Sequence, residues 1–130
     1  MGKGLSLQGY SKTLIQLIYD IKNKADLYTV AARNLSGDNK DLLMRIASEH
    51  NKTAHNLESI CRDMFCHCNT PYKMAYENMV TIKDLIALET QDALHLSHMA
   101  KTAPNKLLFD AYTSMAQKAT NHGYLLLLIL

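Results

Sequence analysis

The sequence is poor in the residues that interrupt helices and mark linkers, with only two prolines and five glycines among 130 residues. So few breaking residues leave little material for linkers, disordered tracts or a second domain. No stretch alternates between apolar and polar residues for long, so β-strands are not expected. Helix-forming residues dominate instead, and 48% of the residues are hydrophobic, enough for one sizeable core. We therefore expect one all-α domain.

Patterns that mark nucleic-acid or membrane binding are also missing. The 14 basic and 12 acidic side chains are spread along the chain, and no basic run occurs, which argues against a nucleic-acid partner. The apolar run at residues 125–130 is far shorter than the roughly 20 residues that span a bilayer, and the N-terminus has no signal-peptide pattern. Three cysteines, an odd number, fit a reducing compartment. A cytoplasmic protein without a membrane partner is expected.

Apolar residues recur at helical spacing in four stretches. This periodicity predicts a lead segment at residues 1–10 and a bundle over 11–130, with helices at 11–35, 40–65, 72–103 and from Asn105 onward. The third helix is expected to bend or restart around residues 78–81.

The expected helix ends carry residues that favour caps and breaks. Gly37 suits the end of the first helix, Asp38 or Asn39 suits the start of the second, and Pro104 breaks the third. A link as short as the one around Gly37 makes consecutive helices antiparallel neighbours. The fold class we predict is an antiparallel four-helix bundle.

Three titratable residues fall near the centres of apolar helix faces: His50, Glu89 and His122. An ionised carboxylate buried without a partner costs at least several kcal/mol, so Glu89 needs one. Two imidazoles and one carboxylate are a ligand set for one divalent metal ion, iron or zinc, with positions left for water or substrate. Two other interpretations stay open: a hydrogen-bonded polar cluster with a protonated imidazole, or three side chains that do not meet. The face around Glu89 contains Ile82, Leu85, Ile86, Ala93, Leu96, Ala100 and Ala103.

Two pairs of similar phrases run through the helices. Residues 28–34 (YTVAARN) read against 96–102 (LSHMAKT), and residues 43–54 (LMRIASEHNKTA) read against 112–123 (YTSMAQKATNHG). With this internal pairing, most of the chain resembles a ferritin-like, rubrerythrin-related four-helix bundle. In that family two irons are held by a Glu from each of the first and third helices and a Glu-x-x-His pair from each of the second and fourth.

The resemblance implies a degenerate form of that centre. Glu89 and His122 match the third-helix Glu and the fourth-helix His. The other positions differ from the family's motif. Ile21, next to Asp20, occupies the position of the first-helix Glu, and Ala119 occupies that of the fourth-helix Glu. His50 and Thr53 occupy the positions of the second-helix Glu-x-x-His pair. A di-iron centre with ferroxidase or peroxidase activity is therefore not expected.

Two functional hypotheses follow from this degenerate motif. The first is a metal-binding protein that holds one iron or zinc ion through His50, Glu89 and His122, with oxidoreductase activity as one option. The second is a metal-free ferritin-like scaffold for assembly or partner binding, in which the same three residues form a buried network.

Three further features are weaker candidates. Cys61, Cys66 and Cys68, together with His67, resemble part of a zinc or redox site without a second ligand pair. A second set, Asp92, His95 and His98, steps along one helix but drifts off its apolar face, which indicates a solvated flank. The apolar run at 125–130 wraps its whole helix, so its outward residues need cover, and we expect a homodimer.

Overall fold

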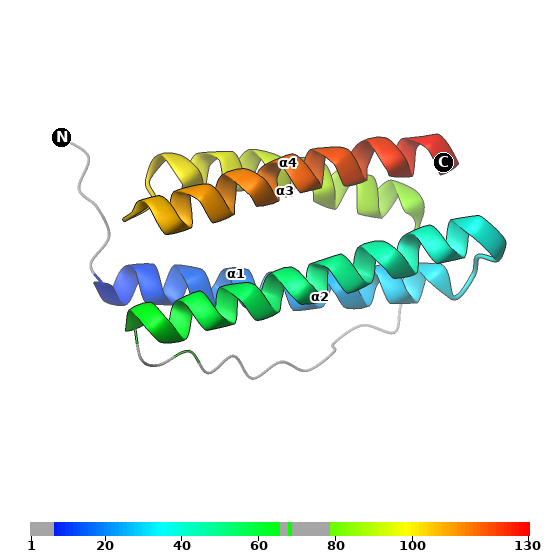
Figure 1. Cartoon of the computed structure of the whole chain (residues 1–130). Helices are drawn as coiled ribbons and strands as arrows, with labels where there is room; N and C mark the ends of the chain where they lie inside the picture. Colours follow the sequence, from blue (N-terminus) through cyan, green and yellow to red (C-terminus); the bar gives the residue numbers. More distant parts are fainter. Residues whose placement is uncertain (1–6, 66–67, 69–78) are drawn as a thin grey trace. The chain divides into compact units, whose positions relative to one another are not determined.

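The computed structural model describes residues 7–65, 68 and 79–130, and within this part of the chain it contains four α-helices and no strand. These are α1 (Leu7–Ala32), α2 (Gly37–Phe65), α3 (Ile82–Lys101) and α4 (Lys106–Ile129) (Figure 1). The all-α class predicted from the sequence is confirmed. The chain divides into two compact units, a first hairpin formed by α1 and α2 and a second hairpin formed by α3 and α4.

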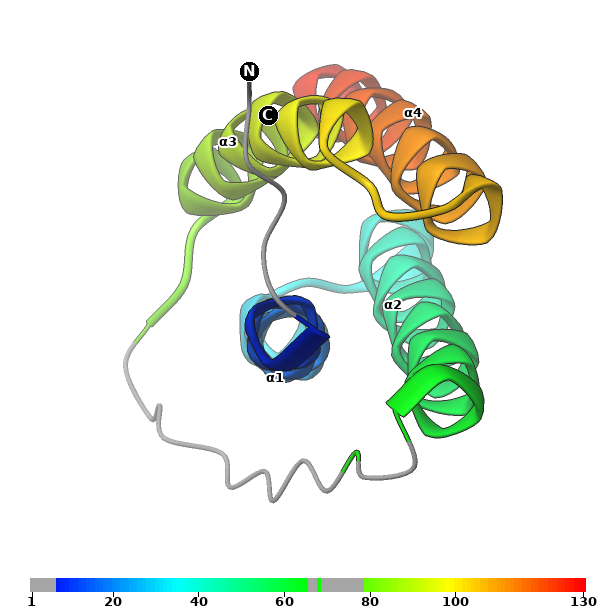
Figure 2. The same ribbon diagram turned by 90° about the vertical axis from the view of Figure 1, so that its left-hand side faces the viewer.

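Within each hairpin the two helices lie side by side, and the second runs back along the first (Figures 1 and 2). In the first hairpin, the turn is tightened by the amide of Arg33, which donates to the carbonyl of Val30 at 3.2 Å, and by the amide of Leu35, which donates to Ala32 at 3.1 Å. Gly37 then adopts a positive φ of 63°, the left-handed conformation that only glycine takes without strain. The glycine expected to end the first helix thus begins the second.

Residues spaced three and four apart form the core of the first hairpin. The contact is supported at its edge by Lys22, whose Nζ lies 3.0 Å from a Glu58 carboxylate oxygen in a half-buried ion pair. On α2, Leu43 is fully buried and its neighbour Leu42 is half-buried. The buried apolar residues are Leu14, Leu17, Ile18, Ile21, Ala25, Tyr28, Val30, Ala31 and Ala32 on α1, and Leu43, Ile46, Ala47, Ala54, Leu57 and Cys61 on α2.

A capping box marks the start of the second hairpin. The Thr81 hydroxyl accepts from the Asp84 amide at 3.2 Å, and the Asp84 carboxylate accepts from the Thr81 amide at 2.9 Å. The third helix therefore begins at Ile82, in agreement with the restart expected around residues 78–81. The expected helical part at residues 72–78 lies outside the described residues.

The α4 helix begins as the sequence predicts, directly after Asn105, whose side-chain oxygen accepts from the Leu108 amide at 3.0 Å. Leu107 is 54% exposed, because the buried stripe starts at Leu108 and a neighbouring residue lies about 100° away. The buried apolar residues of this hairpin are Leu85, Leu96, Met99, Ala100, Leu108, Tyr112, Met115, Ala116, Ala119 and Leu126.

The C-terminal leucines divide between core and solvent. Leu126 is fully buried, whereas Leu127, Leu128 and Leu130 are exposed, Leu128 by 83%. Despite this run, no helix in the described part of the chain is both long enough and apolar enough to cross a membrane.

The two helix caps of the second hairpin should respond differently to acid. Hydrogen bonds from the Thr81 backbone and side chain lower the pKa of Asp84 below its usual value. Its capping contribution is therefore present above the ordinary carboxyl pKa and is lost as the pH falls through the lowered one. We expect Asp84→Ala to lower the free energy of unfolding at pH 6 and to have little effect near pH 2.

Asn105→Ala is the matched control because an amide does not titrate. Its loss, about 1 kcal/mol for an N-cap, should be the same at both pH values. Urea denaturation of both variants at each pH checks this, and an Asp84→Ala loss that stays constant with pH would contradict the charged capping box.

Candidate functional site

Glu89 is a carboxylate in the interior of the second hairpin. It lies one helical turn after Leu85 and seven residues before Leu96 on α3, so all three share one face, and its exposed fraction is 0%. Burial removes the water that would otherwise stabilise the charge, which must then be balanced by a nearby group. The position predicted for Glu89 from helical periodicity is confirmed.

His122 on α4 supplies that neighbouring group. Its Nδ1 atom lies 3.2 Å from Oε2 of Glu89, an ion-pair distance when the imidazole is protonated. The imidazole is 5% exposed, and it lies between Ala119 and Leu126 on the buried stripe of α4. A pair of this kind can exist as carboxylate and imidazolium, or as carboxylate and neutral imidazole around a cation.

Tyr112 belongs to the same buried stripe of α4 but adds no charge to it. Burial raises the pKa of its phenol to about 12 through desolvation. The phenol is therefore neutral throughout the physiological pH range.

His50 occupies the corresponding position in the first hairpin. It is 7% exposed and lies on α2 between Ile46 and Ala54, each one turn away on the buried face. The ring of Tyr28 on α1 packs against it, with ring centroids 5.3 Å apart and planes tilted by 49°. Since Tyr28 is fully buried, this contact restricts how the imidazole can turn.

The three residues have ligand atoms of the kinds that metals use. His50 in the first hairpin, and Glu89 and His122 in the second, are each buried, and each offers one ligand atom. Imidazole nitrogen and carboxylate oxygen are common ligands of zinc and of non-haem iron.

The positions that would complete a di-iron centre offer no carboxylate ligand for a metal ion. Ile21 and Ala119 are buried apolar residues, and neither side chain has a ligand atom. The Thr53 hydroxyl donates to the Glu49 carbonyl of its own helix at 3.0 Å. Asp20, next to Ile21, is exposed and accepts from the side-chain amide of Gln16 at 2.8 Å. Nothing at these positions replaces the missing carboxylates.

The weaker histidine candidates lie at the surface. His95 and His98 are exposed, and Asp92 is half-buried, in agreement with the solvated flank expected from the sequence. His55 is also exposed, and its Nδ1 lies 3.5 Å from Glu58.

Two features were missed by sequence reasoning. A disulfide joins Cys61 to Cys68, and Cys66 and His67 lie outside the described residues. With three cysteines, spacing alone does not select a pair. Lys24 is only 6% exposed, and here the sequence did carry a signal, since Lys24 is three residues after Ile21 and four before Tyr28 on the same stripe.

The Glu89–His122 contact should be energetically coupled. We expect Glu89→Gln and His122→Gln each to destabilise the protein, and the double variant to lose less than the sum, giving an interaction energy of about 1–3 kcal/mol. The physical reason is that either substitution alone leaves a buried partner without its counter-group. Urea denaturation of the four proteins in the presence of a chelator measures this energy.

The exposed pair Lys106 and Asp110 on α4, with Nζ 3.0 Å from Oδ2, is the control for that cycle. Its coupling should be only about 0.3–0.5 kcal/mol, because water screens both charges. Equal coupling energies for the two pairs would mean that burial adds nothing at Glu89.

The chain matches no family model, no curated protein and no solved structure.

Proposed function

We propose that this protein is a ferritin-like four-helix bundle that binds one divalent metal ion through His50, Glu89 and His122. The observation that carries the proposal is Glu89, a carboxylate with no exposed surface that has an imidazole nitrogen 3.2 Å away. His50 supports it as a second imidazole at the centre of a buried helix face. Three protein ligands leave coordination positions for water or a substrate.

The proposal requires the two hairpins to pack with their apolar faces together. Both helices of each hairpin carry an apolar stripe, and such a face needs a cover. The connection allows this arrangement, because residues 66–81 can extend to about 50 Å, whereas a helix of the length of α2 spans about 44 Å. The third helix can therefore start at either end of the first hairpin, including the crossover of a ferritin-like bundle.

The donor set fits iron or zinc and excludes the two-iron form. Two histidines and one carboxylate are the ligands of mononuclear non-haem iron sites, and zinc accepts the same set. Iron held there supplies oxidation–reduction chemistry, and zinc supplies a Lewis acid. A second ion would need carboxylates where Ile21 and Ala119 stand, so the ferroxidase and peroxidase reactions of di-iron proteins do not belong to this proposal.

A metal-free scaffold is the second candidate function, and the same contact favours it. An imidazolium at His122 neutralises Glu89 without a metal, and the bundle then serves assembly or partner binding. The two candidates differ in what Glu89→Gln removes: metal content in the first, and stability alone in the second.

Metal content tests the proposal directly. Protein purified without chelators should contain about one iron or zinc ion per chain, measured by elemental analysis. Glu89→Gln should weaken binding by at least about 100-fold, because loss of a direct ligand exceeds the loss of groups that only orient ligands. His55→Ala removes an exposed histidine from α2 and should leave the metal in place.

Adding iron or zinc to the metal-free protein should also raise the midpoint of thermal unfolding, since a ligand that binds only the folded state stabilises it. Absence of both stoichiometric metal and thermal stabilisation would rule out the metal site and leave the scaffold.

We also propose a homodimer through the C-terminal part of the second hairpin. Ala93, Leu94, Ala119, Gly123 and Leu127 help to line a groove of about 270 Å³, and of these Leu94 and Leu127 are exposed. Its lining residues carry no charge, so two copies of this surface can meet without repulsion, with the leucines of each filling the groove of the other. Such a self-complementary patch is what a two-fold dimer requires.

Light scattering coupled to size-exclusion chromatography checks the dimer. The double variant Leu127→Lys/Leu128→Lys should be monomeric because two like charges per copy would be buried at the interface. Leu107→Lys, which changes an exposed leucine at the other end of α4, should remain dimeric. A monomeric unsubstituted protein would exclude this interface.

A further inference from the structure

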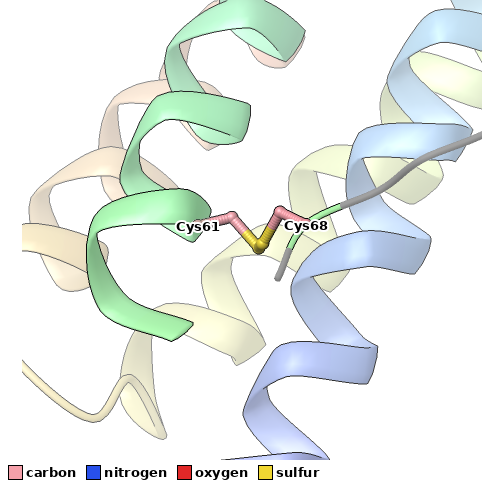
Figure 3. The surroundings of a disulfide bond; sticks show 2 residues. All are labelled: Cys61 and Cys68. Atoms are coloured by element: carbon pink, nitrogen blue, oxygen red, sulfur yellow. A yellow bond between two sulfur atoms is a disulfide. The ribbon is translucent and has the colours of Figure 1, made fainter. Parts of the chain in front are cut away.

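The Cys61–Cys68 disulfide joins the last turns of α2 to the chain that follows it (Figure 3). Cys61 lies one turn before the end of α2 at Phe65, and the two Cα atoms are 5.7 Å apart. This separation is ordinary for a disulfide, so the backbone needs no rearrangement to form it. The bond therefore closes a short loop that runs from Cys61 to Cys68.

The two sulfur-bearing residues differ in access. Cys61 has an exposed fraction of 0% and continues the buried stripe of α2 that includes His50, Ala54 and Leu57. Cys68 is half-buried, so solvent reaches its residue. Thiol–disulfide exchange requires the attacking thiolate to approach one sulfur in line with the bond, and of the two residues Cys68 is the one with exposed surface.

We propose that this disulfide is an exchange site for a low-molecular-weight thiol of the glutathione class, attacked at Cys68. The thiolate sulfur forms a bond to Cys68 Sγ, the Cys61–Cys68 bond breaks, and its electron pair leaves on Cys61, which takes up a proton from water. The products are a mixed disulfide at Cys68 and a free, buried thiol at Cys61. The site uses no metal ion and is independent of the function proposed above.

Exchange would remove a covalent constraint and leave the helix core in place. The Cys61 side chain keeps its position on the buried face, whereas Cys68 is no longer tied to α2. The redox state of the thiol pool thus determines whether Cys68 is covalently tied to α2.

Peptide mapping identifies the attacked sulfur. Protein isolated under non-reducing conditions is incubated with glutathione and chelator, quenched with acid, alkylated and digested with trypsin. Cys61 lies in the peptide 53–62, and Cys68 lies in the peptide 63–73. We expect glutathione on Cys68 to exceed glutathione on Cys61 by more than about tenfold, with the alkylating reagent on Cys61, because access selects the sulfur.

Cys66 shares the second peptide, so fragmentation between residues 66 and 68 and the variant Cys66→Ser are both needed. Cys66→Ser should keep the disulfide and the preference for Cys68. Three free thiols in the isolated protein, a bond that includes Cys66, or glutathione mainly on Cys61 would each overturn the proposal.

Thermal unfolding gives a second measurement. In Cys66→Ser, reduction should lower the unfolding midpoint by about 5–10 °C, because an intact loop restricts the unfolded chain. The double variant Cys61→Ser/Cys68→Ser should melt at the reduced midpoint whether or not reductant is present. An unchanged midpoint on reduction of Cys66→Ser would show that the bond does not constrain the chain.

Discussion

The burial of one carboxylate is the constraint on which the interior of this protein depends. Glu89 exposes none of its surface, and the imidazole of His122 on the facing helix lies 3.2 Å away. A leucine at the same position would contribute roughly 2 kcal/mol of apolar burial without any need for a partner. The chain instead has a residue that requires a specific neighbour, which ties the register of α3 to that of α4 through one pair of atoms.

Helical periodicity was sufficient to predict the four helices and the burial of the three titratable residues. His50, Glu89 and His122 each lie three, four or seven residues from apolar positions, and such spacing places them on buried faces whatever the helices pack against. Burial of a side chain on a face is a local property of the helix, so a single sequence reveals it.

What periodicity did not reveal depends on single bonds or on a precise angle. The start of α3 is set by two hydrogen bonds between Thr81 and Asp84, whereas the apolar periodicity of the sequence continues before Thr81. Leu107 and Leu108 are both apolar, and only the angle of about 100° between them decides which one is buried. The disulfide depends on three-dimensional proximity, because any two of three cysteines are compatible with the spacing. Because disulfides are rare in a reducing compartment, the cytoplasmic location expected from the odd number of cysteines stays a prediction.

The two candidate functions are related by charge balance. Around a divalent ion, two neutral imidazoles and one carboxylate leave one positive charge uncompensated, which a low-dielectric interior disfavours. A hydroxide or an anionic substrate at an open coordination position would remove that charge. Without metal, one proton on an imidazole is enough to neutralise Glu89. Metal and proton would therefore compete for the same nitrogen, and metal binding would release a proton wherever the metal-free pair is protonated. On this argument the scaffold and the metal-binding protein are two states of one buried site, and the pH determines the balance between them.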